Sequence, residues 1–193
     1  MTRKRLLLLS ILVEGVLIVL ALGLGLLLGM PLENWVTWSL GGLGAGLAGT
    51  VVLLLVLEST RRSPFAPARR LMQLVEDQVK PLFRGCTVLD LVMISLLAGI
   101  GEELFFRGFL HGLLEHRVGA GVTLLVSSIL FGLAHCISRE YALFTGLMGL
   151  VLGGLYLLTG DLLASMIAHA SYDFAALLLL TDRSATRVNG PGR

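Results

Sequence analysis

The stretch 88-VLDLVMISLLAGIGEELFFRGFL-110 is a long apolar run that carries three charged residues in its second half. A bilayer core about 30 Å thick is crossed by about 20 apolar helical residues, so this run is long enough to span a membrane. Charged groups within a span are costly and mark function by default. Glu102, Glu103 and Arg107 are therefore the first candidate functional residues.

The whole chain has the composition of a membrane protein. Of its 193 residues, 55% are hydrophobic and only 15% are charged, whereas soluble domains carry about 25% charged residues. The net charge of +2 is too small to indicate a nucleic-acid partner. Cys86 and Cys136 lack a CxxC spacing, so we expect free thiols rather than a disulfide or zinc site. We expect one membrane domain covering residues 1–193.

Five further segments are apolar enough to cross a bilayer, which predicts an all-α, polytopic protein. The six expected spans are residues 6–28, 39–57, 88–110, 122–137, 142–158 and 162–180. Segment 58–84, between the second and third spans, is different because its apolar residues fall on one helical face. This pattern suits an amphipathic helix on the membrane surface or a short soluble linker helix, and the sequence leaves both open.

The distribution of Lys and Arg predicts the orientation. Six spans place both termini on one side, and that side receives thirteen of the fifteen basic residues. Arg107 and Arg117 fall on the other side. An excess of Lys and Arg marks cytoplasmic loops. We therefore expect a multi-pass protein of the cell membrane with both termini cytoplasmic, and a disordered cytoplasmic tail at residues 182–193.

The two glutamates of the third span are expected to have different roles. Glu103 and Arg107 are four positions apart and share a helical face, so Arg107 can neutralise and orient Glu103. Glu102 points about 100° away and is left free to face a cavity. The alternative is a purely structural Glu–Arg pair near a helix end, which does not explain the second glutamate.

Two other expected spans carry histidines. The fourth contains Phe131 and His135, and the sixth contains His169 and Asp173 at i,i+4 spacing. Glu102 lies 17 residues before the expected turn at Gly119, and His135 lies 16 residues after it. In an antiparallel hairpin these two side chains are expected at nearly the same depth.

Carboxylates and imidazoles are the reactive groups of this set, and they allow more than one chemistry. A buried glutamate can act as general base toward water, while histidines hold that water or stabilise an oxyanion. Asp173 could orient His169 as a buried acid does in a catalytic triad. The same residues could instead ligate zinc, which would activate water. Spacing alone leaves the glutamate and metal mechanisms open.

Together the three motifs resemble the CPBP family (CAAX protease and bacteriocin-processing, or Abi, family) of intramembrane glutamic endopeptidases. The family pattern is EExxxR, FxxxH and HxxxN or HxxxD on separate membrane helices, and it covers about residues 91–178 of this chain. The resemblance implies that Glu102 is the general base, that His135 is its partner at the water, and that His169 with Asp173 forms the oxyanion group. Glu103, Arg107 and Phe131 become supporting residues.

The resemblance also implies a peptide or protein substrate, which can be anchored in the bilayer, and no metal or other cofactor. The family was long described as metal-dependent, so zinc remains an alternative to the glutamate mechanism. Asp173 stands where the prenyl-processing members have Asn, so prenyl-protein processing is not carried over.

Other functions also fit the residues. A non-catalytic scaffold or a bacteriocin-immunity protein could retain the same fold. Buried Glu and His also serve proton relays and transporters, for which Glu14 in the first span is the best support. We expect the Glu14 side chain to extend toward the cytoplasm instead.

Overall fold

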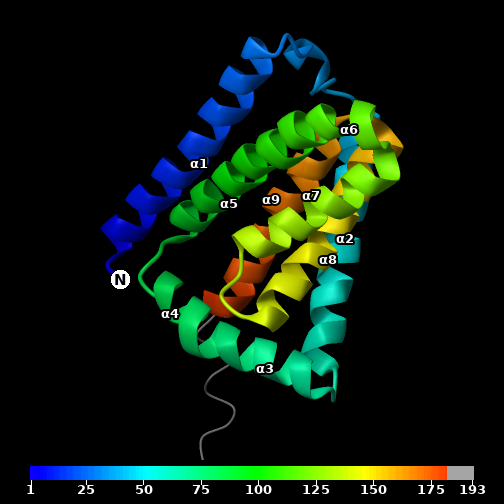
Figure 1. Ribbon diagram of the computed structural model, residues 1–193. Helices are drawn as coiled ribbons and strands as arrows, with labels where there is room; N and C mark the ends of the chain where they lie inside the picture. The colour runs from blue at the N-terminus through cyan, green and yellow to red at the C-terminus, as the bar shows by residue number, and fades with distance from the viewer. Residues whose placement is uncertain (182–193) are drawn as a thin grey trace, which may run out of the picture.

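Residues 1–181 are described by the computed structural model, and in this range the chain is helical without a β-strand (Figure 1). The predicted disordered tail, residues 182–193, lies outside the described residues. The π-helical stretch η2 joins α3 to α4, and the π-helical stretch η3 joins α5 to α6. Each group of three elements is one continuous helix. The elements are α1 Arg3–Leu27, η1 Leu32–Asn34, α2 Leu40–Arg62, α3 Ala66–Leu74, η2 Val75–Val79, α4 Lys80–Phe83, α5 Val88–Glu103, η3 Leu104–His111, α6 Gly112–Val118, α7 Ala120–Ala134, α8 Arg139–Thr159 and α9 Leu162–Thr181.

Four helices are long and apolar enough to cross a membrane by themselves: Arg3–Leu27, Leu40–Arg62, Arg139–Thr159 and Leu162–Leu179. They correspond to the first, second, fifth and sixth predicted spans. The helices Ala66–Phe83 and Val88–Val118 meet at a bend of 113°. If this pair is counted as one broken span, the number of candidate spans rises to five. The membrane character of the chain is thus confirmed, whereas the count of six spans is not.

The third and fourth predicted spans account for the difference. The third is part of a longer helix, Val88–Val118, whose middle carries the charged side chains of the site. The fourth is α7, a helix of 15 residues, which is about 22 Å long at 1.5 Å per residue. That length is short of the roughly 30 Å hydrocarbon core. His135 therefore follows the end of α7 instead of lying within a span.

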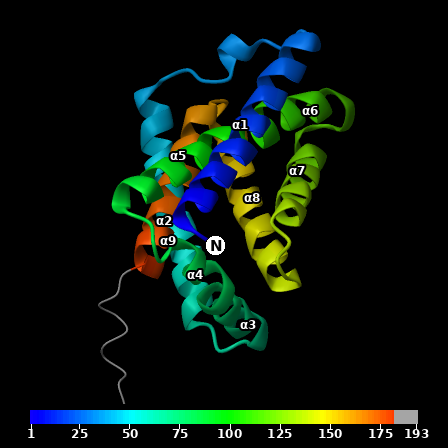
Figure 2. The same ribbon diagram turned by 90° about the vertical axis from the view of Figure 1, so that its left-hand side faces the viewer.

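The amphipathic segment is a helix that crosses one end of the bundle (Figures 1 and 2). Its α3 part packs against α2 and α8, and its α4 part packs against α9. Leu71, on the face turned toward the bundle, is 3% exposed. The segment is therefore packed onto the membrane domain and is not a detached linker.

Helix α9 is the centre of the bundle, since it packs against α2, α5 and α8. Small residues make these contacts close. A Cβ at Gly46 of α2 would lie 2.8 Å from the backbone oxygen of Ala164, and one at Gly99 of α5 would lie 2.8 Å from the backbone nitrogen of Ala170. Close approach at small residues is a common basis of helix packing in membranes. Here it brings α5 and α9, which carry the candidate groups, against each other.

Local signals set the ends of the helices that carry the site. Thr87 and Asp90 form a capping box at the start of α5, which satisfies the first free backbone amides. Gly119 has a φ of +80° between α6 and α7, a conformation that glycine adopts without a side-chain clash. This turn lies where the sequence predicted it, so α5–η3–α6 and α7 form a helical hairpin.

Candidate active site

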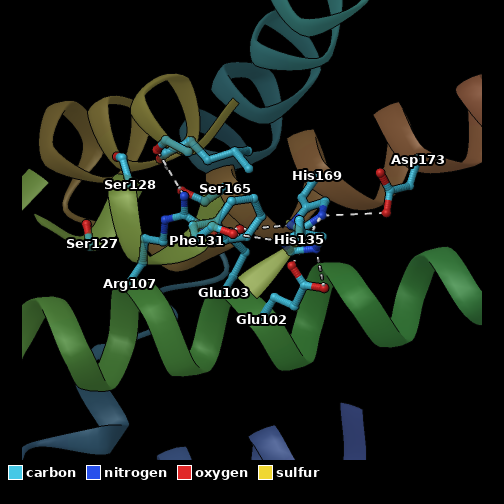
Figure 3. A network of polar contacts seen from close by, with 12 residues as sticks. Glu102, Glu103, Arg107, Ser127, Ser128, Phe131, His135, Ser165, His169 and Asp173 are labelled. Atoms are coloured by element: carbon cyan, nitrogen blue, oxygen red, sulfur yellow. Dashed lines mark hydrogen bonds and ion pairs between the residues drawn. The ribbon is translucent and has the colours of Figure 1, made fainter. Parts of the chain in front are cut away.

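The predicted site residues lie close to one another in the structure (Figure 3). They come from segments far apart in the sequence: the end of α5, the π-helical η3, the end of α7, and α9. All of them except His135 and Asp173 are less than a tenth exposed. The residues brought together are Glu102, Glu103, Arg107, Phe131, His135, His169 and Asp173.

Glu102 faces both histidines. Its Oε1 lies 3.4 Å from Nε2 of His135, and its Oε2 lies 4.0 Å from Nε2 of His169. Glu102 and His135 are thus at the same depth, as their equal distance from Gly119 predicted. Glu102 Oε2 is buried and has no hydrogen-bond partner among the described residues. One carboxylate oxygen therefore remains available to a ligand.

The tautomer of His135 is fixed by the backbone. Its Nδ1 lies 2.8 Å from the carbonyl oxygen of Phe131. A carbonyl can only accept a hydrogen bond, so Nδ1 carries the proton and donates it. Nε2, the atom turned toward Glu102, then has a free lone pair in the neutral imidazole. The FxxxH spacing is what places this donor one helical turn after its acceptor.

Glu103 is the most fully enclosed of the carboxylates, at 0% exposure. Its Oε1 lies 2.7 Å from Nη1 of Arg107 and 2.9 Å from Nδ1 of His169. The predicted pairing with Arg107 is therefore present. The second contact was not predicted, because no sequence spacing relates α5 to α9.

Arg107 is fully buried and links several elements. Its Nη2 donates to the backbone oxygen of Gly149 on α8 over 2.9 Å. Its guanidinium carbon lies 4.6 Å from the ring centroid of Phe131, within the range of a cation–π contact. Phe131 also lies against His135, with ring centroids 4.7 Å apart. Arg107 and Phe131 thus link Glu103 on one side of the site to His135 on the other.

Asp173 stands one turn beyond His169 on α9. Its Oδ2 is 3.5 Å from Nε2 of His169, longer than the 2.9 Å from Glu103 Oε1 to Nδ1 of the same ring. Glu103 is thus the closer orienting group of His169. Since Nδ1 donates to Glu103, Nε2 of His169 is the atom directed toward Asp173 and Glu102.

A cavity of about 390 Å³ opens beside these residues. Glu102, His135, His169 and Asp173 form one part of its wall, and the facing wall is mostly apolar. The amphipathic helix supplies a large share of that wall: Leu71, Met72, Val75, Glu76, Val79 and Phe83. The charged groups thus meet an enclosed apolar space, which is typical of ligand sites.

The buried serines near the site are used within the fold. Ser128 donates to the backbone oxygen of Leu124 over 2.7 Å, and Ser165 donates to that of Leu152 over 2.9 Å. Cys86 and Cys136 are free thiols, as expected. The carboxylates and imidazoles line the cavity and are able to exchange protons, and the phenols of Tyr141 and Tyr172 lie in the same wall.

The placement of Glu14 corrects one expectation. Its side chain does not extend toward the cytoplasm: the residue is 8% exposed and lies against Gly101 of α5. The tight contact with glycine explains the difference, because α1 approaches α5 so closely that the carboxyl is enclosed.

The metal alternative was also tested against the geometry. Within residues 1–181, no group of three or more His, Cys, Asp or Glu side chains is placed to hold a metal ion. A zinc site requires three or four such ligands around one point. No step of the mechanism proposed below depends on a metal.

Residues 84–175 match the family model described as Type II CAAX prenyl endopeptidase, Rce1-like. This part of the chain is Rce1-like. The matched segment, just under half of the chain, begins before α5 and contains all seven residues of the site. It overlaps the segment 91–178 on which the predicted resemblance rests, and it matches the suspected CAAX-protease family. No match was found among curated proteins or solved structures.

The family describes membrane proteases, and the apolar helices agree with a membrane protein. Residues 84–175 are thus similar to a family of membrane proteases, and the apolar helices identify the chain as a membrane protein. Helices α1 and α2 lie outside the matched segment, although both pack against α5 or α9 within it.

Proposed function

We propose that this protein is an intramembrane endopeptidase in which Glu102 activates water for hydrolysis of a peptide bond. The observation that carries the proposal is the Glu102–His135 pair on the cavity wall. One carboxylate oxygen faces a histidine nitrogen whose tautomer is fixed by the Phe131 carbonyl. A base and a second proton acceptor are thereby directed to the same point.

The reaction follows from these positions. A water held between Glu102 and Nε2 of His135 gives a proton to the Glu102 carboxylate as its oxygen adds to the scissile carbonyl carbon. The protonated Glu102 then transfers that proton to the leaving nitrogen as the C–N bond breaks. The products are a carboxylic acid and an amine, which exchange a proton to become a carboxylate and an ammonium, and Glu102 returns to its starting state.

His169 and Asp173 are placed to serve the oxyanion of the tetrahedral intermediate. Because Nδ1 of His169 donates to Glu103, Nε2 can donate only when the ring is an imidazolium. Glu102, Glu103 and Asp173 surround that ring and favour a positive charge on it. An imidazolium directed into the cavity would stabilise the negative oxygen. Glu103 and Arg107 hold this ring in place without contacting the substrate.

Peptide cleavage in detergent tests the mechanism. We expect Glu102→Gln and His135→Ala each to reduce kcat by about 10²-fold or more, the range for loss of a general base or its partner. Glu33→Gln, an exposed carboxylate outside the site, is the matched control and should cleave like the wild type. Undiminished cleavage by both site variants would refute the mechanism.

A chelator on the same preparation separates the glutamate mechanism from the metal one. We expect cleavage to persist after treatment with a zinc chelator and dialysis. If cleavage is lost on chelation and is restored by added zinc, the metal-dependent alternative replaces ours.

We further propose that both termini face the cytoplasm. Thirteen of the fifteen Lys and Arg support this orientation through the positive-inside rule. The start of α1 and the described end of α9 lie at the same end of the bundle, near α4 (Figure 1). Cys136 is exposed in the loop after α7, so an impermeant thiol reagent should label it only in opened cells. Labelling in intact cells would reverse the orientation.

A further inference from the structure

Helix α1 lies outside the family match, yet it places a carboxyl group beside the site. The residues of α1 that are buried are Leu6, Glu14, Ala21 and Gly25. They recur at spacings of one or two helical turns and form the face that packs against α5 and η3. Glu14 is thus in the packing face of a bilayer helix, where an acidic residue is costly unless it has a role.

The position of Glu14 is fixed by a glycine of α5. A Cβ at position 101 would lie 2.8 Å from Glu14 Oε2 and 3.0 Å from the Glu14 backbone oxygen. Only the absence of a side chain at Gly101 allows this approach. Because Gly101 directly precedes Glu102, the Glu14 carboxyl lies against the backbone that carries the proposed base.

Among the described residues, Glu14 has no Lys or Arg partner, and the opposite charges that reach it are those of His135 and His169. Its Oε2 is buried and has no hydrogen-bond partner among the described residues. η3 and α4 also contact α1, but Arg107 of η3 is paired with Glu103 and Lys80 of α4 with Glu76. Burial in an apolar environment favours the protonated carboxyl over the charged one.

The titratable groups that face Glu14 belong to the site. They are Glu102 from α5, His169 and Asp173 from α9, and His135 at the end of α7. A charge placed on Glu14 would therefore act on every group of the proposed mechanism. Two carboxylates that share a site resist simultaneous ionisation, so a neutral Glu14 allows Glu102 to carry the charge.

We propose that Glu14, outside the catalytic set, is a proton-bearing carboxyl beside Glu102 whose ionisation at alkaline pH stops hydrolysis. The proposal rests on the hydrolytic function proposed above. Hydrolysis adds negative charge to the substrate carbonyl oxygen, and an ionised Glu14 would repel this oxyanion. The neutral form leaves the field of His135 and His169 unopposed.

The Glu14→Gln variant tests the proposal because glutamine has the shape of the protonated carboxyl and cannot ionise. We expect its kcat/KM at neutral pH to stay within about threefold of the wild-type value. The alkaline limb of its pH–activity profile should move upward by about one pH unit or more, the size of effect that a neighbouring charge exerts. Glu33→Gln, an exposed carboxylate, should leave both limbs in place.

Deprotonation of a histidine would give the opposite result. If His135 or His169 sets the alkaline limb, removing a nearby carboxyl leaves that limb unchanged or moves it downward. Either result would overturn the proposal. A folded Glu14→Gln variant that loses more than tenfold of the activity at neutral pH would overturn it as well.

Infrared spectroscopy gives a readout that does not depend on cleavage. The wild-type minus Glu14→Gln spectrum at neutral pH should contain the C=O stretching band of one protonated carboxyl, and this band should vanish at alkaline pH. A carboxylate band at neutral pH instead would refute a protonated Glu14. If the protein cuts no peptide, the function above fails, and this spectrum still decides the state of Glu14.

Discussion

Glu103 and His169, 66 positions apart in the chain, are joined by a contact of 2.9 Å between Oε1 and Nδ1. The same oxygen of Glu103 also accepts from Nη1 of Arg107 over 2.7 Å. One carboxylate thus binds a cation of its own helix and an imidazole of α9. This geometry separates the adjacent glutamates: Glu103 holds the site together, and Glu102 faces the cavity.

The two glutamates should respond differently to the same isosteric change. We expect Glu103→Gln to lower the free energy of unfolding by about 3–5 kcal/mol, the cost of leaving a buried charge without its partner, because Arg107 is fully buried. Glu102→Gln should abolish cleavage and cost less than about 1 kcal/mol. Thermal unfolding in detergent, measured beside cleavage, compares the two. Equal destabilisation by both changes would contradict this division of roles.

Asp173 offers a test of the oxyanion group. We expect Asp173→Asn to keep cleavage within about tenfold of the wild type, because an amide at this position can donate to a negative oxygen. Asp173→Ala should lose about 10²-fold or more in kcat, typical of removing one oxyanion partner. The kcat and KM of the two variants are compared at one pH. If Ala is tolerated as well as Asn, Asp173 has no part in the reaction.

The contact between α5 and α9 should tolerate no added methyl group. A Cβ at Gly99 would lie 2.7 Å from the Cβ of Ala170 and 2.8 Å from its backbone nitrogen. We expect Gly99→Ala to separate the helices, to lower the unfolding temperature, and to reduce cleavage, because Glu103 and His169 depend on this spacing. Overpacking of this kind typically costs about 1–3 kcal/mol.

Gly154→Ala is the matched control for that change. A Cβ at Gly154 of α8 would meet no atom within 4 Å, so the substitution should leave cleavage unchanged and the unfolding temperature the same or slightly higher. If Gly99→Ala behaves like Gly154→Ala, the close approach of α5 and α9 does not determine the site.

Asp161, in the loop between α8 and α9, should make stability depend on pH. Burial opposes its ionisation, but hydrogen bonds from Thr37 and Leu163 stabilise the carboxylate and leave its pKa below the ordinary value of 3.8. A lowered folded-state pKa gives stability that is complete above the unfolded-state pKa and is lost as pH falls through the folded-state value.

We therefore expect the wild type to lose this contribution below about pH 4, and Asp161→Asn to lack it at neutral pH. The loss should be about 1–3 kcal/mol, the cost of disturbing a buried hydrogen-bonded group. Unfolding temperatures measured across this pH range provide the comparison. A wild type and an Asp161→Asn variant that differ equally at neutral and acidic pH would contradict it.

The sequence was sufficient for relationships within one helix or across one turn. The Glu103–Arg107 pair follows from four-residue spacing, and the common depth of Glu102 and His135 follows from their distances to Gly119. Both relationships are present in the structure. Each depends only on the helical rise and on the position of one turn.

Relationships between distant helices could not be predicted in the same way. The Glu103–His169 contact and the enclosure of Glu14 depend on how each helix is rotated about its axis. That rotation is set by close contacts between helices, such as those at Gly99 and Gly101. The hydropathy of a segment does not reveal such contacts. The predicted count of six spans is not confirmed for a related reason: an apolar run does not reveal that α7 ends at Ala134.

The position of His169 on α9 has a consequence for the synthesis of the protein. The chain emerges from its N-terminus, so Glu102, Glu103 and His135 are in place before α9 exists. Under the proposed mechanism, a nascent chain that has inserted α1 to α8 already holds the base but has no oxyanion group. Hydrolytic activity would begin only when α9 docks between α2 and α5, so completion of the bundle itself acts as the safeguard against premature proteolysis.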